Sequence, residues 1–242
     1  MKLPALLRAF LPNRSMPTRV LFGPFRGARV EMRPSESLRK IFGLYEHELN
    51  LWLEKVLSKV DTVLDVGAND GYFAFGCAEA LRRLGRHGEI VAFEPQAQHC
   101  TQLRASQELQ PPGSMISISV REGFVGREVS PGHTTLDVAA DELGLTPETR
   151  RTLIKIDVEG AEMDVVAGAS RWLRPENFFL IEVHTLELLD RLLNHFAASN
   201  LPIDRLDQRP LPLLGLEARA ATNCWIVSRL SFEEKRSPRN RR

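Results

Sequence analysis

The chain has 242 residues, 43% of them hydrophobic, which suffices for one large domain and is too few for two ordinary domains with a linker. Its 32 Lys and Arg nearly balance its 31 Asp and Glu, which excludes the strong positive field typical of nucleic-acid-binding proteins. The three cysteines, Cys77, Cys100 and Cys224, have neither metal-ligand spacing nor an even count, and indicate reduced thiols. Residues 1–10 resemble neither a signal peptide nor a membrane span, so we expect a soluble cytoplasmic protein without stable membrane insertion.

The N-terminal part is predicted to form an extension to the main domain. Residues 1–17 contain three prolines and several basic residues, which indicates a poorly ordered arm. Two β-prone runs, 19–22 and 28–32, flank a Gly- and Pro-rich turn and predict a hairpin. Apolar residues at helical spacing in 43–57 predict a helix. Tyr45, near its start, either covers a ligand or only anchors packing.

From residue 61 onward, predicted strands and helices alternate, which indicates an α/β fold: a mostly parallel seven-stranded sheet with helices on both faces. We expect an N-terminal arm, hairpin and lid-like helix over 1–60, one catalytic domain over 61–230, and a basic tail over 231–242. The tail is interpreted as disordered and solvated, rather than as a contact for nucleic acid or an anionic surface. The predicted strands are 62–66, 89–94, 115–120, 153–157, 178–184, 201–206 and 222–229, and the predicted helices are 71–84, 97–108, 135–143, 161–173 and 186–199.

A glycine-containing turn follows the first strand of this domain. The run Asp65-Val-Gly-Ala-Asn-Asp-Gly71 ends a short apolar strand and precedes a segment of helical length. Gly67 permits close approach of a ligand to the backbone, and Gly71 lies where the helix starts, with its free N–H groups. The spacing lacks the three glycines of the dinucleotide fingerprint, while Asp65 and Asn69 add polar groups. The candidate cofactor residues here are Asp65, Gly67, Ala68, Asn69 and Gly71; a turn without a ligand is the alternative.

A second strand ends in Glu94 and Pro95. Glu94 follows Gly67 by 27 residues, close to the offset of about 20 at which a ribose-binding carboxylate occurs in βαβ units. One carboxylate can accept hydrogen bonds from two vicinal ribose hydroxyls, so the pair predicts a nucleoside-containing ligand. Glu122 and Gly123, at the end of the next strand, complete the predicted cofactor set, since ligands of open α/β sheets lie beyond the carboxyl ends of the strands.

The sequence resembles the FkbM-type methyltransferases over about residues 40–230. The resemblance is carried by 65–71, by Ala92-Phe-Glu-Pro95 and above all by Leu153-Ile-Lys-Ile-Asp-Val-Glu-Gly-Ala-Glu162. It implies a Rossmann-like class I methyltransferase fold with an antiparallel last strand, S-adenosyl-L-methionine as cofactor, and a hydroxyl acceptor on a sugar or natural product. The segment 105–135 departs from the family pattern, which leaves the adenine contacts unassigned.

Polar residues at the ends of two later strands predict the chemistry. Asp157 and Glu159 are two residues apart, as are Glu182 and His184, and side chains at that spacing share one side of an extended chain. If the two strands are neighbours, as the resemblance implies, the four groups converge. Methyl transfer to a hydroxyl needs a group that takes the proton, a role suited to histidine or a carboxylate. We therefore assign Asp157, Glu159 and His184 as catalytic.

No residues have dedicated metal-ligand spacing along the chain, so no metal ligand is assigned; a divalent cation held by these acids is the alternative. Glu162 and Asp164 are interpreted as acids of a helix start.

The sequence thus predicts an S-adenosylmethionine-dependent O-methyltransferase with a small polar, carbohydrate or natural-product acceptor and no nucleic-acid partner. The alternatives are a nicotinamide-dependent oxidoreductase, disfavoured by the missing third glycine, and a non-catalytic cofactor-binding protein. Acceptor identity and oligomeric state have no recognisable code in the sequence.

Overall fold

A central sheet of seven strands organises the computed structural model, which describes residues 11–211, 215–216 and 223–230. The strand order is β10-β11-β9-β8-β3-β4-β5, and only β11 runs antiparallel to its neighbours. This confirms the predicted mostly parallel seven-stranded α/β fold and its reversed last strand. The strands are β3 (Thr62–Val66), β4 (Gly88–Glu94), β5 (Ile116–Glu122), β8 (Thr152–Ile156), β9 (Phe178–Val183), β10 (Ile203–Leu206) and β11 (Cys224–Ser228).

The central strands are buried on both faces, which explains their nearly continuous apolar sequences. Alternate residues of β3 and β8 enter two separate cores: Val63 and Leu153 belong to one, Leu64 and Ile154 to the other. The chain proceeds from β3 outward through β4 to β5, and then returns to β8 on the other side of β3. The strand order therefore switches between β3 and β8, and such a switch opens a crevice at the carboxyl ends of the strands.

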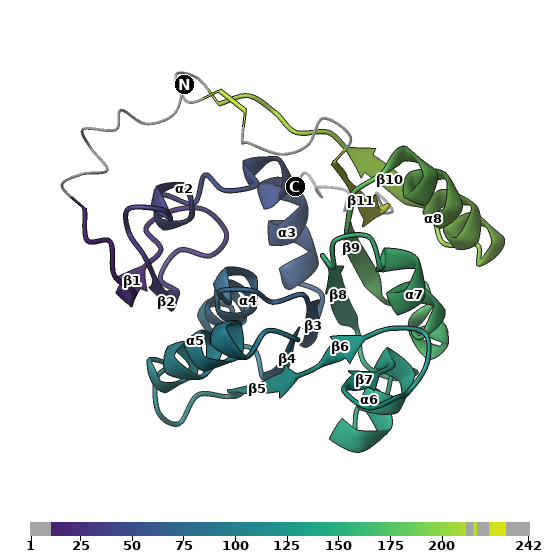
Figure 1. Cartoon of the computed structure of the whole chain (residues 1–242), viewed down its shortest axis with the longest axis horizontal. Helices are drawn as coiled ribbons and strands as arrows, with labels where there is room; N and C mark the ends of the chain where they lie inside the picture. Colours follow the sequence, from purple (N-terminus) through teal and green to yellow (C-terminus); the bar gives the residue numbers. More distant parts are fainter. Residues whose placement is uncertain (1–10, 212–214, 217–222, 231–242) are drawn as a thin grey trace, which may run out of the picture.

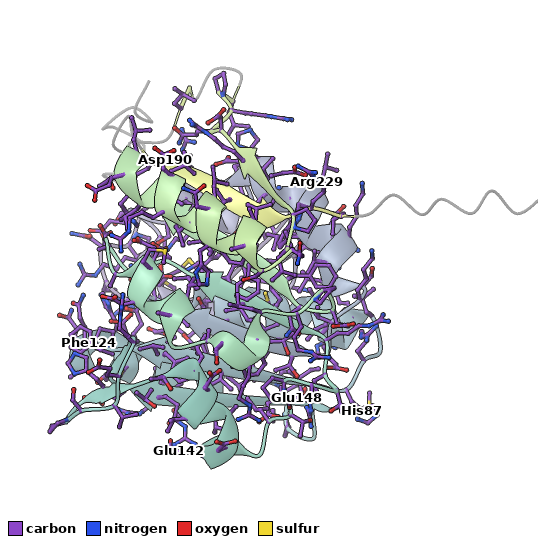
Figure 2. The ribbon with its side chains drawn as sticks, turned by 90° about the vertical axis from the view of Figure 1, so that its right-hand side faces the viewer. His87, Phe124, Glu142, Glu148, Asp190 and Arg229 are labelled. Carbon is purple, nitrogen blue, oxygen red and sulfur yellow. The ribbon has the colours of Figure 1, made fainter. Side chains whose placement is uncertain are left out.

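Helices cover both faces of the sheet (Figure 1). One face is covered by the elements before β5, and the other by those that follow it. The helices of the first face are α3 (Asn50–Leu57), α4 (Tyr72–Arg83) and α5 (Ala97–Glu108); those of the second are α6 (Leu136–Leu143), α7 (Glu162–Ala167) and α8 (Leu186–Ala198). In the view of Figure 2, onto the second face, Phe124 lies at one edge of the molecule, and His87 and Glu148 lie at the opposite edge. Phe124 follows β5, whereas His87 precedes β4 and Glu148 precedes β8, so these edges are the carboxyl and amino ends of the parallel strands.

The N-terminal extension differs in detail from its prediction. The hairpin pairs β1 (Met16–Arg19) with β2 (Arg29–Met32), so residues 16 and 17 form strand rather than arm, and residues 1–10 lie outside the described chain. Helix α3 begins at Asn50, because positive φ angles at Gly43 and Glu46 interrupt any helix before it. Short helices, α2 (Leu38–Ile41) and the 3-10 helix η1 (His47–Leu49), occupy that stretch.

Two further differences follow from local packing. The predicted helix 161–173 divides into α7 and the 3-10 helix η2 (Ser170–Trp172) around Gly168. A Cβ at Gly168 would lie 2.0 Å from the carbonyl oxygen of Gly126, so a close approach of two backbone segments fixes this break. A small parallel pair, β6 (Phe124–Val125) and β7 (His133–Thr134), was not predicted. The basic tail 231–242 lies outside the described residues.

The extension and the sheet share one hydrophobic core. Val30 of the hairpin, Leu53 of α3 and Phe75 of α4 belong to the same buried cluster as Val63 and Leu153. The three cysteines are free and buried. Among the described residues, no helix combines the length and the apolarity that crossing a membrane requires.

Candidate active site

A pocket of about 860 Å³ lies at the carboxyl ends of β3, β4, β8 and β9. It opens at the switch point between β3 and β8, where ligands of open α/β sheets bind. We call it the main pocket. Its lining residues are Tyr45, Val66, Gly67, Asn69, Phe93, Glu94, Pro95, Gln96, His99, Gly123, Phe124, Val125, Asp157, Val158, Glu159, Ala161, Glu182, His184 and Asn223.

One side of the main pocket is formed by Gly67 and Asn69 of the turn 67–71 together with Glu94, and we call it the glycine-turn wall. The amides of Gly67 and Ala68 both donate to the carbonyl of Phe93, which fastens the turn to β4. Asn69 and Gly71 have positive φ angles, and Gly71 directly precedes α4. Of this turn, Gly67 and Asn69 face the pocket, and the amide side chain of Asn69 suits a polar ligand end.

The reason for a glycine at position 67 differs from the predicted one. A Cβ there would lie 1.9 Å from the carbonyl oxygen of Asp157, and the φ of Gly67 is +81°. The side chain of any other residue would therefore collide with the chain leaving β8 rather than occupy the approach of a ligand. Gly67 lines the pocket, but its identity is set by the close contact of two strand ends.

Glu94 is a buried acid that holds the turn. Its Oε2 accepts from the amide of Asn69 at 2.8 Å, and its Oε1 accepts from the amide of Gln96 at 2.9 Å. The side chain is about 3% exposed, so it is not a solvated acid at a strand end. A carboxylate oxygen has two lone pairs, so both oxygens retain capacity to accept hydroxyl groups from the pocket.

Aromatic residues border the pocket beyond β5. Phe93 and Phe124 line it together with Gly123, and the exposed ring of Phe124 stacks on His133 with centroids 4.9 Å apart. Glu122 does not line the main pocket: it pairs with Arg104 at 3.2 Å and faces a smaller neighbouring pocket. Phe93, Phe124 and Val125 make this part of the lining apolar, and aromatic residues of this kind can pack against a planar ring.

The side of the pocket at the ends of β8 and β9 contains Asp157, Glu159, Glu182 and His184, which we call the acceptor cluster. Strands β8 and β9 are neighbours, and Ile156 pairs with Ile181, so the residues that follow converge as predicted. Ligand atoms of Asp157, Glu182 and His184 lie within 4.8 Å of one another. Glu159 has a positive φ and an exposed side chain, whose Oε2 lies 3.5 Å from Nε2 of His184.

His184 is oriented by Glu162. Its Nδ1 lies 2.6 Å from Oε1 of Glu162, which is fully buried at the start of α7 and also accepts from the amide of Gly160. This hydrogen bond raises the pKa of His184, against the opposing effect of burial. With Nδ1 donating to Glu162, the neutral ring presents the lone pair of Nε2. Glu162 thus serves the site as well as the helix start, whereas Asp164 pairs with Arg127 at the surface.

Lys155 lies behind both sides of the pocket. Its Nζ is 3.2 Å from Oδ2 of Asp157, 3.3 Å from Oδ1 of Asp65 and 3.4 Å from the carbonyl oxygen of Gly67. Burial alone would lower the pKa of Lys155, but the carboxylates of Asp157 and Asp65 outweigh it and raise that pKa. Burial likewise opposes the low pKa of Asp157, which the Lys155 ammonium holds below its usual range. Burial raises the pKa of Asp65 to about 6.

The structure brings most of the predicted site residues to the main pocket. Those that line it are Gly67, Asn69, Glu94, Pro95, Gly123, Asp157, Glu159 and His184. Four predicted cofactor residues do not line it: Asp65 and Ala68 are buried beneath the turn, Gly71 starts α4, and Glu122 faces the smaller pocket. Sequence reasoning gave no site role to Lys155, Glu162 and Asn223. Lys155 could have been noticed in the sequence, because a lysine within an apolar strand indicates a buried anionic partner.

A seven-stranded sheet with one reversed strand, and a pocket at its switch point bounded by a glycine turn and a strand-end acid, define a class I methyltransferase fold. Within that class, residues 104–198 match the family model described as the methyltransferase FkbM domain, which confirms the resemblance seen in the sequence. The chain is a methyltransferase, and its residues 104–198 are similar to the FkbM methyltransferase domain.

The chain is also similar to one protein of known name and to solved structures. The chain is 27% identical over 177 residues to hexuronic acid methyltransferase AglP of Haloferax volcanii, covering 65% of this chain and 70% of that protein. Among solved structures, it is similar to the C-terminal domain of precorrin-6Y C5,15-methyltransferase from Rhodobacter capsulatus, at 18% identity, with a TM-score of 0.47 and coverage of 74% and 85%. It is also similar to the putative methyltransferase yhhF from Escherichia coli, at 14% identity, with a TM-score of 0.48 and coverage of 88% and 98%.

Proposed function

We propose that this protein transfers the methyl group of S-adenosyl-L-methionine to a hydroxyl oxygen of a sugar-like acceptor. The observation that carries the proposal is the pairing of two unlike walls in one pocket: the glycine-turn wall with Glu94, and the acceptor cluster. Methyltransferases of this kind use S-adenosylmethionine, and the main pocket has room for its nucleoside and its amino-acid end together.

The proposed cofactor position follows from the chemistry of the glycine-turn wall. Glu94 would accept hydrogen bonds from the ribose hydroxyls, and the turn at 67–71 would hold the amino-acid end. The adenine ring would lie against Phe93, Gly123 and Phe124, where the lining is apolar. This placement directs the sulfonium methyl toward the acceptor cluster, because the cluster forms the remaining side of the same pocket.

The acceptor cluster supports a hydroxyl acceptor. In the transfer, the acceptor oxygen bonds to the methyl carbon as the carbon–sulfur bond breaks, and the hydroxyl proton must leave. Asp157, Glu159 and His184 surround the hydroxyl, and one of these three groups receives its proton. Four carboxylates line the pocket, and none of its described lining residues is Lys or Arg. Such a pocket disfavours a bare carboxylate as the attacking group and favours a neutral hydroxyl.

The relative that methylates hexuronic acids indicates the acceptor class. A hexuronic acid has ring hydroxyls and a carboxylate, so it provides two chemically different oxygens for methylation. The negative charge of the pocket lining favours the hydroxyl of such a sugar over its carboxylate, and the product would be a methyl ether.

Calorimetry with S-adenosylmethionine and with NAD tests the cofactor, and a panel of hexuronic acids, neutral sugars and small natural-product alcohols tests the acceptor. We expect binding of S-adenosylmethionine, no binding of NAD, and an alkali-stable methyl ether as product. Binding of NAD alone would favour an oxidoreductase. Cofactor binding without turnover over the whole panel would favour a non-catalytic binding protein. An alkali-labile methyl ester would show that the carboxylate is the acceptor.

A further inference from the structure

We propose that Asp157, Glu182 and His184 form a binding site for a divalent cation within the main pocket. Each residue offers one ligand atom, and the three atoms lie within 4.8 Å of one another. All three side chains line the main pocket, so the remaining coordination positions face the space available to the acceptor. The inference rests on the proposed function and specifies how the acceptor hydroxyl is bound.

Strand pairing, rather than spacing along the chain, creates this set. Ile156 of β8 pairs with Ile181 of β9, which places Asp157 beside Glu182 where both strands end. His184 follows two residues later and points to the same side as Glu182 while the chain stays extended. The linear sequence shows no metal-ligand motif, because the ligands of the proposed site come from the ends of two strands that become neighbours only in the folded sheet.

Each of the three side chains has a further partner that fixes its orientation. Nδ1 of His184 bonds to the buried Glu162 at 2.6 Å, which directs Nε2 toward the cluster. Oε1 of Glu182 accepts from Asn223 at 3.4 Å, and Oδ2 of Asp157 accepts from Lys155 at 3.2 Å. Metal-binding residues usually have such outer partners, and a histidine ligand usually donates its other N–H to a carboxylate.

The charge of the pocket also favours a cation. Its lining carries four carboxylates, of Glu94, Asp157, Glu159 and Glu182, while its described lining residues include no Lys or Arg. The buried ammonium of Lys155 lies 3.2 Å from Asp157, but it is shared with the carboxylate of Asp65. The sulfonium of the proposed cofactor would add a single positive charge. A divalent cation would offset more of this negative charge and would present a positive partner to the acceptor oxygen. Two carboxylates and one imidazole suit a cation such as Mn²⁺ or Mg²⁺.

The cation also accounts for the fate of the proton. A hydroxyl bound to a divalent cation loses its proton more readily than a free hydroxyl. Glu159, whose carboxylate lies 3.5 Å from Nε2 of His184, receives that proton. The resulting oxygen bonds to the methyl carbon while the carbon–sulfur bond breaks, and the bonding electron pair remains on sulfur as the neutral thioether.

The test is a titration of the full chain with Mn²⁺, after treatment with EDTA and exchange into metal-free buffer, without cofactor or acceptor. We expect saturable binding of one Mn²⁺ per chain. Asp157→Asn and Glu182→Gln should each weaken it at least about tenfold, the scale for losing a ligand or its orienting partner. Asp164→Asn is the matched control, because Asp164 is an acid of the same region that pairs with Arg127 outside the pocket. Thermal melting checks each variant, and His184→Gln replaces any variant that does not fold.

The absence of saturable Mn²⁺ binding, or equal binding by the folded Asp157→Asn and Glu182→Gln variants, would overturn the site. An activity assay separates this outcome from failure of the proposed function. Methyl transfer that persists in EDTA, together with no Mn²⁺ binding, overturns the cation site and leaves the methyltransferase proposal standing. Saturable, variant-sensitive Mn²⁺ binding by a chain that does not bind S-adenosylmethionine supports the site and overturns the proposed function.

Discussion

The two walls of the main pocket are built from different parts of the polypeptide. The glycine-turn wall depends on backbone geometry, with amides of the turn and of Gln96 held by the Phe93 carbonyl and the Glu94 carboxylate. The acceptor cluster depends on side chains, with Asp157, Glu182 and His184 held by partners from other elements. The shape of the glycine-turn wall depends mainly on backbone conformation, so few single substitutions alter it. The acceptor cluster is made of side chains, so each substitution there alters a functional group directly. The two walls should therefore separate binding of the cofactor from turnover.

The largest separation is expected from His184→Ala and Asp157→Asn. Each should lower kcat and kcat/KM together by about a hundredfold or more, the scale for a group that acts on the reacting hydroxyl. Affinity for S-adenosylmethionine, measured by calorimetry, should remain within a few-fold of the unmodified protein. If affinity falls as steeply as activity, the cluster belongs to the cofactor pocket and the division into two walls is incorrect.

Gly67→Ala should disturb both walls at once, because its Cβ would lie 1.9 Å from the carbonyl oxygen of Asp157. We expect a loss of more than about 2 kcal/mol in the free energy of unfolding, measured with urea. Gly85→Ala is the matched control, since Gly85 also has a positive φ, of +66°, but has open space at its Cβ. Equal losses in the two variants would show that only backbone strain, and not the contact between strand ends, requires a glycine at 67.

Glu94→Ala should weaken the binding of S-adenosylmethionine at least about tenfold, because it removes charge-assisted hydrogen bonds to the ribose. The amide of Asn69 also loses its partner, so part of the loss reflects a looser turn. Turnover at saturating cofactor should change less than affinity does. Unchanged affinity in calorimetry would refute the assignment of Glu94 to the ribose.

The smallest expected effect is that of Glu162→Gln, which keeps the shape of the side chain but removes the charge beside His184 and the Gly160 amide. Activity should fall about tenfold, as is usual for groups that orient a site residue through a hydrogen bond. Asp164→Asn, in the same first turn of α7, should leave activity unchanged because Asp164 pairs with Arg127 at the surface. Equal effects of the two substitutions, on activity and on melting temperature, would indicate that Glu162 serves only the helix start.

Local chain signals explain what could be predicted from the sequence. The turn at 67–71 and the strands around it are encoded within a few consecutive residues, and the structure has them within one or two residues of their predicted bounds. The N-terminal helix was predicted too long because the positive φ of Glu46 has no signal in a residue of that type. The break at Gly168 was missed because it depends on Gly126, a residue distant in the chain.

The acceptor cluster was predicted only in part because its assembly depends on long-range pairing. Asp157, Glu159 and His184 stand out as polar residues after apolar strands, and neighbouring strands bring them together. The roles of Glu162 and Asn223 depend on how α7 and β11 pack against β9, which no local pattern reveals. Asp65 was assigned to the pocket because it adjoins the turn. Successive side chains of β3 point to alternate faces of the sheet, however, and the side chain of Asp65 is buried in the protein beside Lys155.

The contact between Gly67 and Asp157 also bears on how related sequences should be interpreted. Because the neighbouring strand end requires this glycine, a descendant that had lost catalysis would still need it to fold. The glycine turn is therefore a marker of ancestry and folding, and its presence does not distinguish a working enzyme from a pseudoenzyme. The carboxylates and the histidine of the acceptor cluster can be substituted once selection no longer maintains turnover. Their joint presence, as in this chain, is the more informative guide when proteins of this type are sorted into active and inactive members.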